Sequence, residues 1–412
     1  IMQKFKQYIT EAAGKNLHMT HLEDAVLDGG VTGTRNVINY LRAIRDMLSG
    51  NASAPVSLTT KWDGAPAIFA GVDPSDGQFF VAKKGVFNKT PKLYKTESEI
   101  NDELSGDLAV KFKIALKEFS KLGIEGVVQG DLLYTQSDLK TENIDGVPCV
   151  TFHPNTIVYA VPKSSDLGKT ISKSKIGVVW HTTYRGTSLE SMSASFGKAI
   201  ATKQKKVNSV WSIDAVFQDK SGSATMTKSE TDTLTAKLSA AGSLFRKIKA
   251  NKLNELSTNA ELNVRVNTFI NTKVREGTRI TNVKAFIIGL QRYIEEVAKK
   301  EADKVKQQTT KDAKIQKGKD LLMYFDKKDL KDVGNIFELY NLLVDAKHLI
   351  IDKLNKVEGI TTLLKTAKGF EVTGQEGFVA IDHVGQNTLK IVDRLEFSKA
   401  NFSTEYIKGW QK

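Results

Sequence analysis

A lysine that follows a short β-rich segment is the first residue of this sequence that could do chemistry. Lys61 comes directly after residues 56–60, and Asp63 and Gly64 follow it in the tetrapeptide Lys-Trp-Asp-Gly. A lysine acts as a nucleophile only when a fraction of its amine is deprotonated. Burial or nearby cations are needed to produce that neutral form. The tetrapeptide alone would equally fit an incidental lysine beside a β-turn.

Other segments place charged residues at or near the ends of short apolar runs. Four of them are Val81-Ala82-Lys83-Lys84-Gly85, Gln129-Gly130-Asp131-Leu132, Gly374-Gln375-Glu376-Gly377 and Leu389-Lys390-Ile391-Val392. Together with residues 61–64, their order and spacing resemble motifs I, Ia, III, IV and V of the covalent nucleotidyltransferase superfamily. That superfamily includes ATP-dependent polynucleotide ligases and mRNA-capping enzymes, and the resemblance is closest to phage-type RNA ligases. It covers roughly residues 55–185 and 370–400.

The resemblance implies a role for each matched residue. Lys61 would attack the α-phosphorus of ATP and carry AMP, while Lys390 and Lys84 would offset the phosphate charge. Glu376 and Asp131 would hold Mg²⁺ or Mn²⁺. The remaining expected nucleotide contacts are Thr60, Asp63, Gly64, Lys83, Trp180 and Arg394.

This chain departs from the superfamily pattern in three places. Asp131 stands where motif III usually has Glu, and Val392 stands where motif V usually has a second lysine, which Arg394 could replace. Trp180 lies where an aromatic residue would stack on adenine, but no acid follows it directly. An ordinary core position is an equally good interpretation of Trp180.

Composition limits the class of protein and its partners. The 412 residues are 40% apolar and 26% charged, which is typical of a globular protein, and no apolar run approaches the length of a membrane span. One cysteine, Cys149, and six histidines provide neither a disulfide nor a zinc cluster. We therefore expect a cytoplasmic protein, in the host cytoplasm if it is phage-encoded, that is a monomer without membrane contact.

The positive charge is concentrated in one part of the chain. The net charge is +13, and residues 241–330 hold 20 Lys and Arg against 11 Asp and Glu, a local net charge of +9. Such a block favours binding to a polyanion such as RNA. A solvated, lysine-rich helical surface is the alternative interpretation.

The elements that would position these residues follow from periodicity. Strands are expected at residues 56–60, 67–70, 78–83, 126–134, 156–161, 176–182, 210–217, 378–384 and 388–397. Helices are expected at residues 31–48, 108–122 and 283–297, and after a capping box formed by Thr227 and Glu230. The predicted fold is α+β, an antiparallel-sheet nucleotidyltransferase core (ATP-grasp-like ligase) with a helical N-terminus and a large all-α insertion.

The predicted divisions are a helical segment at 1–52, a nucleotidyltransferase domain at 53–190 and 369–402, a basic helical insertion at 191–368, and a tail at 403–412. Because the sequence leaves no room for an OB-fold domain after Lys390, the RNA-ligase branch is favoured. The expected function is an ATP-dependent RNA ligase that seals 5′-phosphate and 3′-hydroxyl ends. The alternatives are a minimal DNA ligase, a GTP-dependent guanylyltransferase, and a non-catalytic relative that binds nucleic acid.

Overall fold

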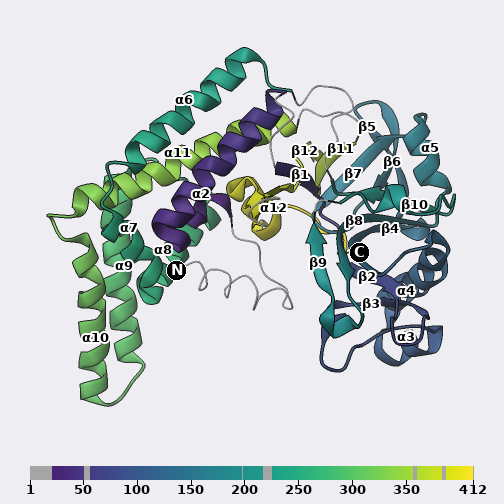
Figure 1. Cartoon of the computed structure of the whole chain (residues 1–412), viewed down its shortest axis with the longest axis horizontal. Helices are drawn as coiled ribbons and strands as arrows, with labels where there is room; N and C mark the ends of the chain where they lie inside the picture. Colours follow the sequence, from purple (N-terminus) through teal and green to yellow (C-terminus); the bar gives the residue numbers. More distant parts are fainter. Residues whose placement is uncertain are drawn as a thin grey trace.

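The computed structural model describes residues 21–50, 56–196, 198–216, 225–355, 360–382 and 387–411. It is an α+β structure with antiparallel sheets, which confirms the predicted fold class at that level. Most helices gather on one side of the molecule and most strands on the other, as Figure 1 shows.

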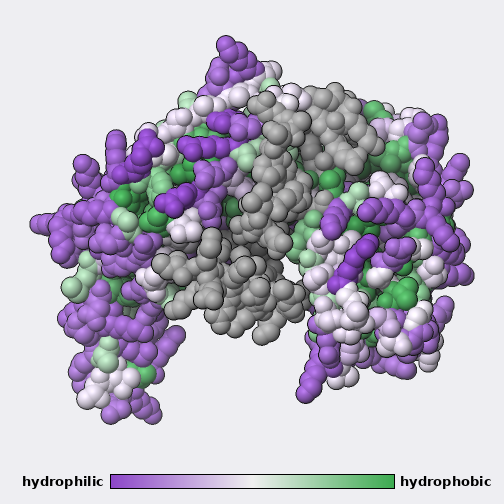
Figure 2. Space-filling view, viewed as in Figure 1, coloured by the Kyte–Doolittle hydropathy of each residue, from purple (hydrophilic) through white to green (hydrophobic). Residues whose placement is uncertain are grey.

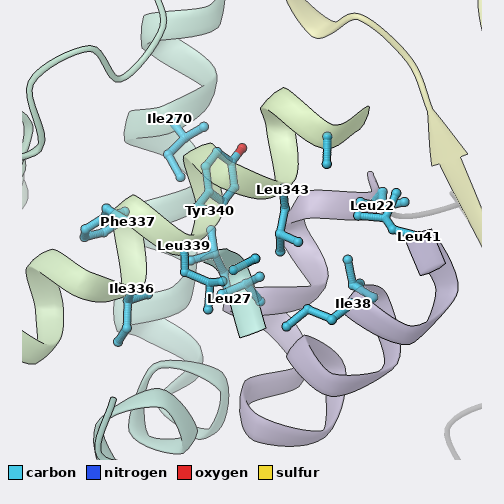
Figure 3. Packing of buried hydrophobic residues seen from close by; sticks show 14 of the residues in the cluster. Leu22, Leu27, Ile38, Leu41, Ile270, Ile336, Phe337, Leu339, Tyr340 and Leu343 are labelled. Atoms are coloured by element: carbon cyan, nitrogen blue, oxygen red, sulfur yellow. The ribbon is translucent and has the colours of Figure 1, made fainter. Parts of the chain in front are cut away.

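Among the described residues, seven helices form the helical side. They are α2 (Ala25–Leu48), α6 (Lys228–Phe245), α7 (Ala250–Thr258), α8 (Ala260–Arg275), α9 (Val283–Asp303), α10 (Gln308–Leu322) and α11 (Leu330–Leu354). Their apolar faces share one cluster, in which Leu27 and Ile38 of α2 pack with Leu339 and Leu343 of α11 (Figure 3). Burying one such side chain contributes about 1.5–3 kcal/mol, so α2 is held firmly to helices far along the chain.

Three of the predicted helices are confirmed by local detail. The expected segments 31–48 and 283–297 lie within α2 and α9. Thr227 caps α6 by accepting from the Glu230 amide, and Glu230 reaches back to the Thr227 amide. None of the described helices is both long and apolar enough to cross a membrane.

The strands form three sheets. The strands are β1 (Val56–Lys61), β2 (Ala67–Val72), β3 (Phe79–Ala82), β4 (Val127–Thr135), β5 (Lys140–Ile144), β6 (Val147–Phe152), β7 (Ile157–Pro162), β8 (Ile176–Arg185), β9 (Ser193–Phe196), β10 (Val210–Asp214), β11 (Thr361–Thr366), β12 (Gly369–Val372), β13 (Gly377–Asp382) and β14 (Asn387–Ile391). A six-stranded sheet has the order β10-β8-β4-β2-β3, with β9 on β8. A five-stranded sheet has the order β12-β11-β7-β6-β5, and a three-stranded sheet the order β1-β13-β14. Strand β10 pairs with β8 in parallel, and the other strand pairs are antiparallel.

Shorter helices accompany the sheets. They are α3 (Glu97–Glu103), α4 (Gly106–Phe119), α5 (Asp166–Lys173) and α12 (Arg394–Phe402). Helix α4, which was expected at 108–122, covers one face of the six-stranded sheet through Phe112 and Phe119. Helices α3 and α5 and the hairpin of β5 and β6 were not predicted.

The three-stranded sheet joins the two sides of the molecule. Successive side chains of a strand point to opposite faces. Leu58, Phe378 and Ile391 share one face and belong to the helical core cluster. The opposite face therefore carries Lys61 of β1 and Lys390 of β14.

The C-terminal part differs from the prediction. A strand was expected over residues 388–397, but β14 ends at Ile391 and α12 begins at Arg394. Asp393 causes the change, because its carboxylate accepts from the amides of Leu395 and Glu396 and caps the helix.

The helices α6 to α11 all lie between β10 and β11 in the chain. Strands β9, β10 and β11, which fall within residues 191–368, pair with β8 or β7 and belong to the sheets. Helix α2 packs in the same core as α6 to α11. The predicted N-terminal helical face at Phe5, Tyr8 and Ile9 lies outside the described residues.

Candidate active site

Lys61 and Glu376 meet at the edge of the three-stranded sheet. Lys61 is opposite Gly377 in the antiparallel register of β1 and β13, which brings Glu376 alongside the lysine side chain. Lys61 Nζ forms an ion pair with Glu376 Oε1, and only 8% of the glutamate side chain is exposed. Burial raises the pKa of Glu376 to about 7, although the Lys61 charge opposes the rise. The pair is therefore a partly buried nucleophile candidate in contact with a carboxyl group that titrates near neutral pH.

Lys390 lies on the same face of this sheet. Thr59 is opposite Val379, and Val379 is opposite Lys390, so Lys390 is on the same face as Lys61, with strand β13 between them. Burial, and to a smaller extent the charge of Lys61, lower the pKa of Lys390. The structure thus brings the predicted motif I and motif V lysines together.

Val392 stands at the position where motif V of the superfamily usually has its second lysine, and it is a buried apolar residue. Val392 is only 2% exposed, and a Cβ on Gly377 would lie 2.5 Å from its Cγ2. Arg394 does not replace that lysine. Its guanidinium instead lies 2.6 Å from Asp24 Oδ1 and 2.6 Å from Asn271 Oδ1, where it ties α12 to the helical side. Helix α12 therefore turns Arg394 toward the helices and away from Lys61 and Glu376, and its expected nucleotide contact stays a prediction.

Asp131 approaches Lys61 from the six-stranded sheet. It lies on β4, and its carboxyl pKa is raised by burial while His181 and Lys61 lower it. The loop after Lys61 fits closely over β4, because a Cβ on Gly64 would lie 2.6 Å from the Cβ of Asp131. Gly64 is therefore required for close approach of the loop to β4.

Asp63 holds this loop in place. Its carboxylate accepts from Asn155 Nδ2 at 2.5 Å and from the amides of Thr156 and Ile157 at 2.6 and 2.7 Å. Its own amide donates to Tyr159 Oη at 2.7 Å. With 3% exposure, Asp63 anchors the loop to the start of β7, and these bonds occupy both carboxylate oxygens.

His181 faces the site, whereas Trp180 does not. Gln129 is opposite Thr182 and Gly130 is opposite Trp180, so His181 is the extra residue of a β-bulge. Its Nε2 lies 3.7 Å from Asp131 Oδ2, and its Nδ1 is 2.7 Å from Thr182 Oγ1. Burial lowers the pKa of His181, so the imidazole is neutral at neutral pH. Bulges commonly re-aim side chains next to active sites.

Trp180 is a core residue. It is completely buried, its ring lies 5.2 Å from that of Phe119, and its Nε1 donates to Ser212 Oγ at 2.8 Å. The predicted stacking of Trp180 on adenine is therefore wrong, and the core interpretation is confirmed. The buried Trp180 ring also leaves no room for a side chain at position 130, because a Cβ on Gly130 would lie 2.6 Å from the ring.

Another aromatic residue borders Lys61. Trp62 is half-buried, and its ring lies 5.0 Å from Tyr159 and 6.3 Å from Trp211. No role was predicted for Trp62 from the sequence, although its position directly after Lys61 indicated that it would lie near the site.

Thr60, Lys83 and Lys84 do not join this group. Thr60 alternates with Lys61 and shares the face of Phe378, which packs on the helical side. Lys83 and Lys84 are exposed after β3. Within the described residues, no ion pair connects either lysine to Glu376 or Asp131.

The site has two carboxylates suited to a cation. Among the described residues, no three His, Cys, Asp or Glu side chains are grouped so that they could hold a metal by themselves. Mg²⁺, however, commonly uses one or two carboxylates together with substrate phosphates and water. Asp131 and Glu376 fit that pattern, because both carboxyl groups lie near Lys61, whose charge opposes the rise that burial causes in their pKa values.

Comparison with known proteins places the chain in a family. A family model described as a family of unknown function, DUF6267, matches residues 16–406. The chain belongs to this family. No curated protein and no solved structure matches the chain. The DUF6267 match assigns no activity, so a function has to be argued from the site.

Proposed function

We propose that this DUF6267 protein is an ATP-dependent RNA ligase that works through a lysyl-AMP intermediate. The observation that carries the proposal is the meeting of Lys61, Glu376, Lys390 and Asp131, which come from three distant parts of the chain. Charged groups with shifted pKa values that gather in one partly buried place are typical of functional sites.

The chemistry assigns a task to each residue. Lys61 Nζ forms a bond to the α-phosphorus of ATP while the bond from that phosphorus to pyrophosphate breaks. Lys61 must first transfer a proton to Glu376, its partner in the structure, or to water, and part from that carboxyl group. Lys390 lies where its ammonium can offset charge on the α-phosphate, since phosphoryl transfer depends on positioning and charge neutralisation. Asp131 and Glu376 would hold Mg²⁺, which neutralises phosphate charge when bound.

The α9–α10 hairpin is the proposed RNA surface. The two helices extend away from the remaining helices (Figure 1), and hydrophilic residues cover most of this hairpin in Figure 2. Four exposed lysines lie near its turn: Lys299, Lys300, Lys304 and Lys306. Each is without an ion pair among the described residues, so these charges are available to the phosphates of an RNA strand.

The test is covalent labelling with α-labelled nucleotide. The wild-type protein should take up acid-labile AMP from ATP, and Lys61→Ala should take up none. Lys365→Ala is the matched control, since Lys365 is a partly exposed lysine on β11 that pairs with Glu142. Labelling from GTP instead of ATP would indicate a guanylyltransferase, and label that persists in Lys61→Ala would remove the proposal. Sealing of labelled RNA and DNA nicks then separates RNA ligase from DNA ligase.

A further inference from the structure

A cavity lies on the helical side, and its walls include none of Lys61, Asp131 or Glu376. Its volume is about 420 Å³, and it is lined by α8, residues 278–281, α11 and the start of α12. Pockets for small ligands typically have about 300–1,000 Å³. This cavity is therefore large enough for one nucleotide.

The floor of the cavity contains a satisfied ion pair. Lys347 Nζ lies 2.7 and 2.8 Å from the two carboxylate oxygens of Glu23, and both side chains are 1% exposed. Two buried opposite charges in such contact neutralise each other. Lys347 and Glu23 therefore shape the floor of the cavity, and a charged group of a ligand has to bind to residues nearer the surface.

Arg279 is an exposed cation in the cavity wall whose ion pair is long. Its side chain is 45% exposed, and its Nη2 lies 3.0 Å from His348 Nε2. The nearest carboxylate, that of Asp393, is 3.8 Å away. The same carboxylate lies 3.3 Å from His348 Nδ1 and accepts hydrogen bonds from two amides of α12. Burial lowers the pKa of His348, so Arg279 rests on a neutral ring at neutral pH. A guanidinium in this setting is well suited to a phosphate group, which it can bind through two parallel hydrogen bonds.

The rest of the wall suits a nucleobase. Tyr340 and Ile270 supply an aromatic and an aliphatic side chain and lie close together in Figure 3. Glu338 and Asn341 supply oxygen acceptors, and the Asn341 amide nitrogen is fixed by a 2.8 Å bond to the carbonyl of Ile280. Carboxylate and amide oxygens accept hydrogen bonds from the exocyclic amino groups of bases.

The cavity adjoins the strand that carries Lys390. Arg394, in the cavity wall, is three residues beyond the end of β14, and Glu23, also in the wall, is two residues beyond His21, which forms a β-bridge with Lys390. We infer that the cavity binds the 5′-phosphorylated terminal nucleotide of an RNA strand, with Arg279 on the phosphate. This inference rests on the proposed ligase function, because it assigns the site of that enzyme's second substrate.

The test measures binding of a 3′-fluorescent hexaribonucleotide with a 5′-phosphate and of the same oligonucleotide with a 5′-hydroxyl. We expect wild type to prefer the phosphorylated end about tenfold, as for a charge-assisted contact, and Arg279→Ala to lose that preference. Arg275→Ala is the matched control, since Arg275 is an exposed arginine at the end of α8 that is not in the cavity wall.

Lys61 labelling by ATP is measured on the same three proteins and should be equal in all of them. A phosphate preference that survives in Arg279→Ala, or none in wild type, would overturn the inference. Equal affinity for a free 5′-mononucleotide would overturn the assignment to a strand end. Absence of Lys61 labelling in wild type would instead count against the ligase proposal, independently of the binding result.

Discussion

The Glu376 carboxylate pairs with the Lys61 ammonium, although the two residues lie near opposite ends of the chain. The antiparallel pairing of β1 with β13 creates this contact, because it sets Lys61 opposite Gly377. The proposed nucleophile is thus held by a mostly buried carboxyl group whose pKa is raised to about 7. Substitution of either partner should therefore change the chemistry at Lys61.

Glu376→Ala should slow AMP transfer to Lys61 by about 10²-fold, the order expected when one charged group of a phosphoryl-transfer site is removed. Mn²⁺ should restore part of the rate. The rate of labelling by α-labelled ATP is the measurement, with Glu371→Ala on β12 as the control, since Glu371 is exposed. An unchanged rate in Glu376→Ala would show that another carboxylate does this work.

Lys61→Arg should abolish AMP uptake while the protein stays as stable as wild type. Arginine retains the positive charge beside Glu376, but it does not lose its proton in a protein and cannot attack phosphorus. Labelling and thermal melting together separate loss of chemistry from loss of folding. Labelled Lys61→Arg would mean that a different residue accepts AMP.

The neighbours Trp180 and His181 should respond differently to substitution. Trp180→Phe removes buried volume and the bond to Ser212, so the free energy of unfolding should fall by about 1–3 kcal/mol while the KM for ATP remains unchanged. His181→Ala should alter the rate of AMP uptake, because the imidazole lies beside Asp131. Urea denaturation and initial rates measure the two effects, and a raised KM in Trp180→Phe would restore the stacking hypothesis.

His153 should make the fold sensitive to acid. Burial lowers the pKa of His153 to about 4, from an ordinary value of 6.5. Below pH 6.5 the unfolded chain binds a proton that the folded chain does not, so the free energy of unfolding falls as the pH drops from 6.5 to 4. The total loss is about 3 kcal/mol. The measurement is the free energy of unfolding against pH for wild type and His153→Gln. If the two curves run parallel, His153 does not cause the acid sensitivity.

Charge reversal on the α9–α10 hairpin should affect RNA and spare ATP. Lys299, Lys300, Lys304 and Lys306 changed together to Glu should leave AMP uptake intact and weaken RNA binding. The slope of log affinity against log salt should flatten by about 0.7–0.9 for each phosphate that the hairpin no longer neutralises. The matched control reverses four exposed lysines of the strand-rich side: Lys89, Lys163, Lys173 and Lys198. An unchanged slope in the folded hairpin variant would mean that these lysines are only a solvated surface.

Local patterns in the sequence determined several elements without help from the fold. The Thr227–Glu230 capping box and the apolar period of residues 283–297 depend on interactions within a few residues, so their structural outcome could be read directly. The strand at β1 was visible for the same reason, whereas the need for a glycine at position 64 comes from its contact with Asp131 on β4. The acid at Asp393 was also a local signal of the helix that begins at Arg394, although the apolar run before it favoured a strand.

Only the tertiary structure decided which side chains share the site. The pairing of β1 with β13 unites Lys61 with Glu376, and a single extra residue in β8 turns His181 toward Asp131 while Trp180 stays in the core. Strand register and bulges are set by the packing of both sheet faces against segments distant in sequence, and one residue of displacement moves a side chain to the other face. Residue type and spacing therefore determined the available chemistry of this protein, and the packing of its sheets decided which of those residues meet.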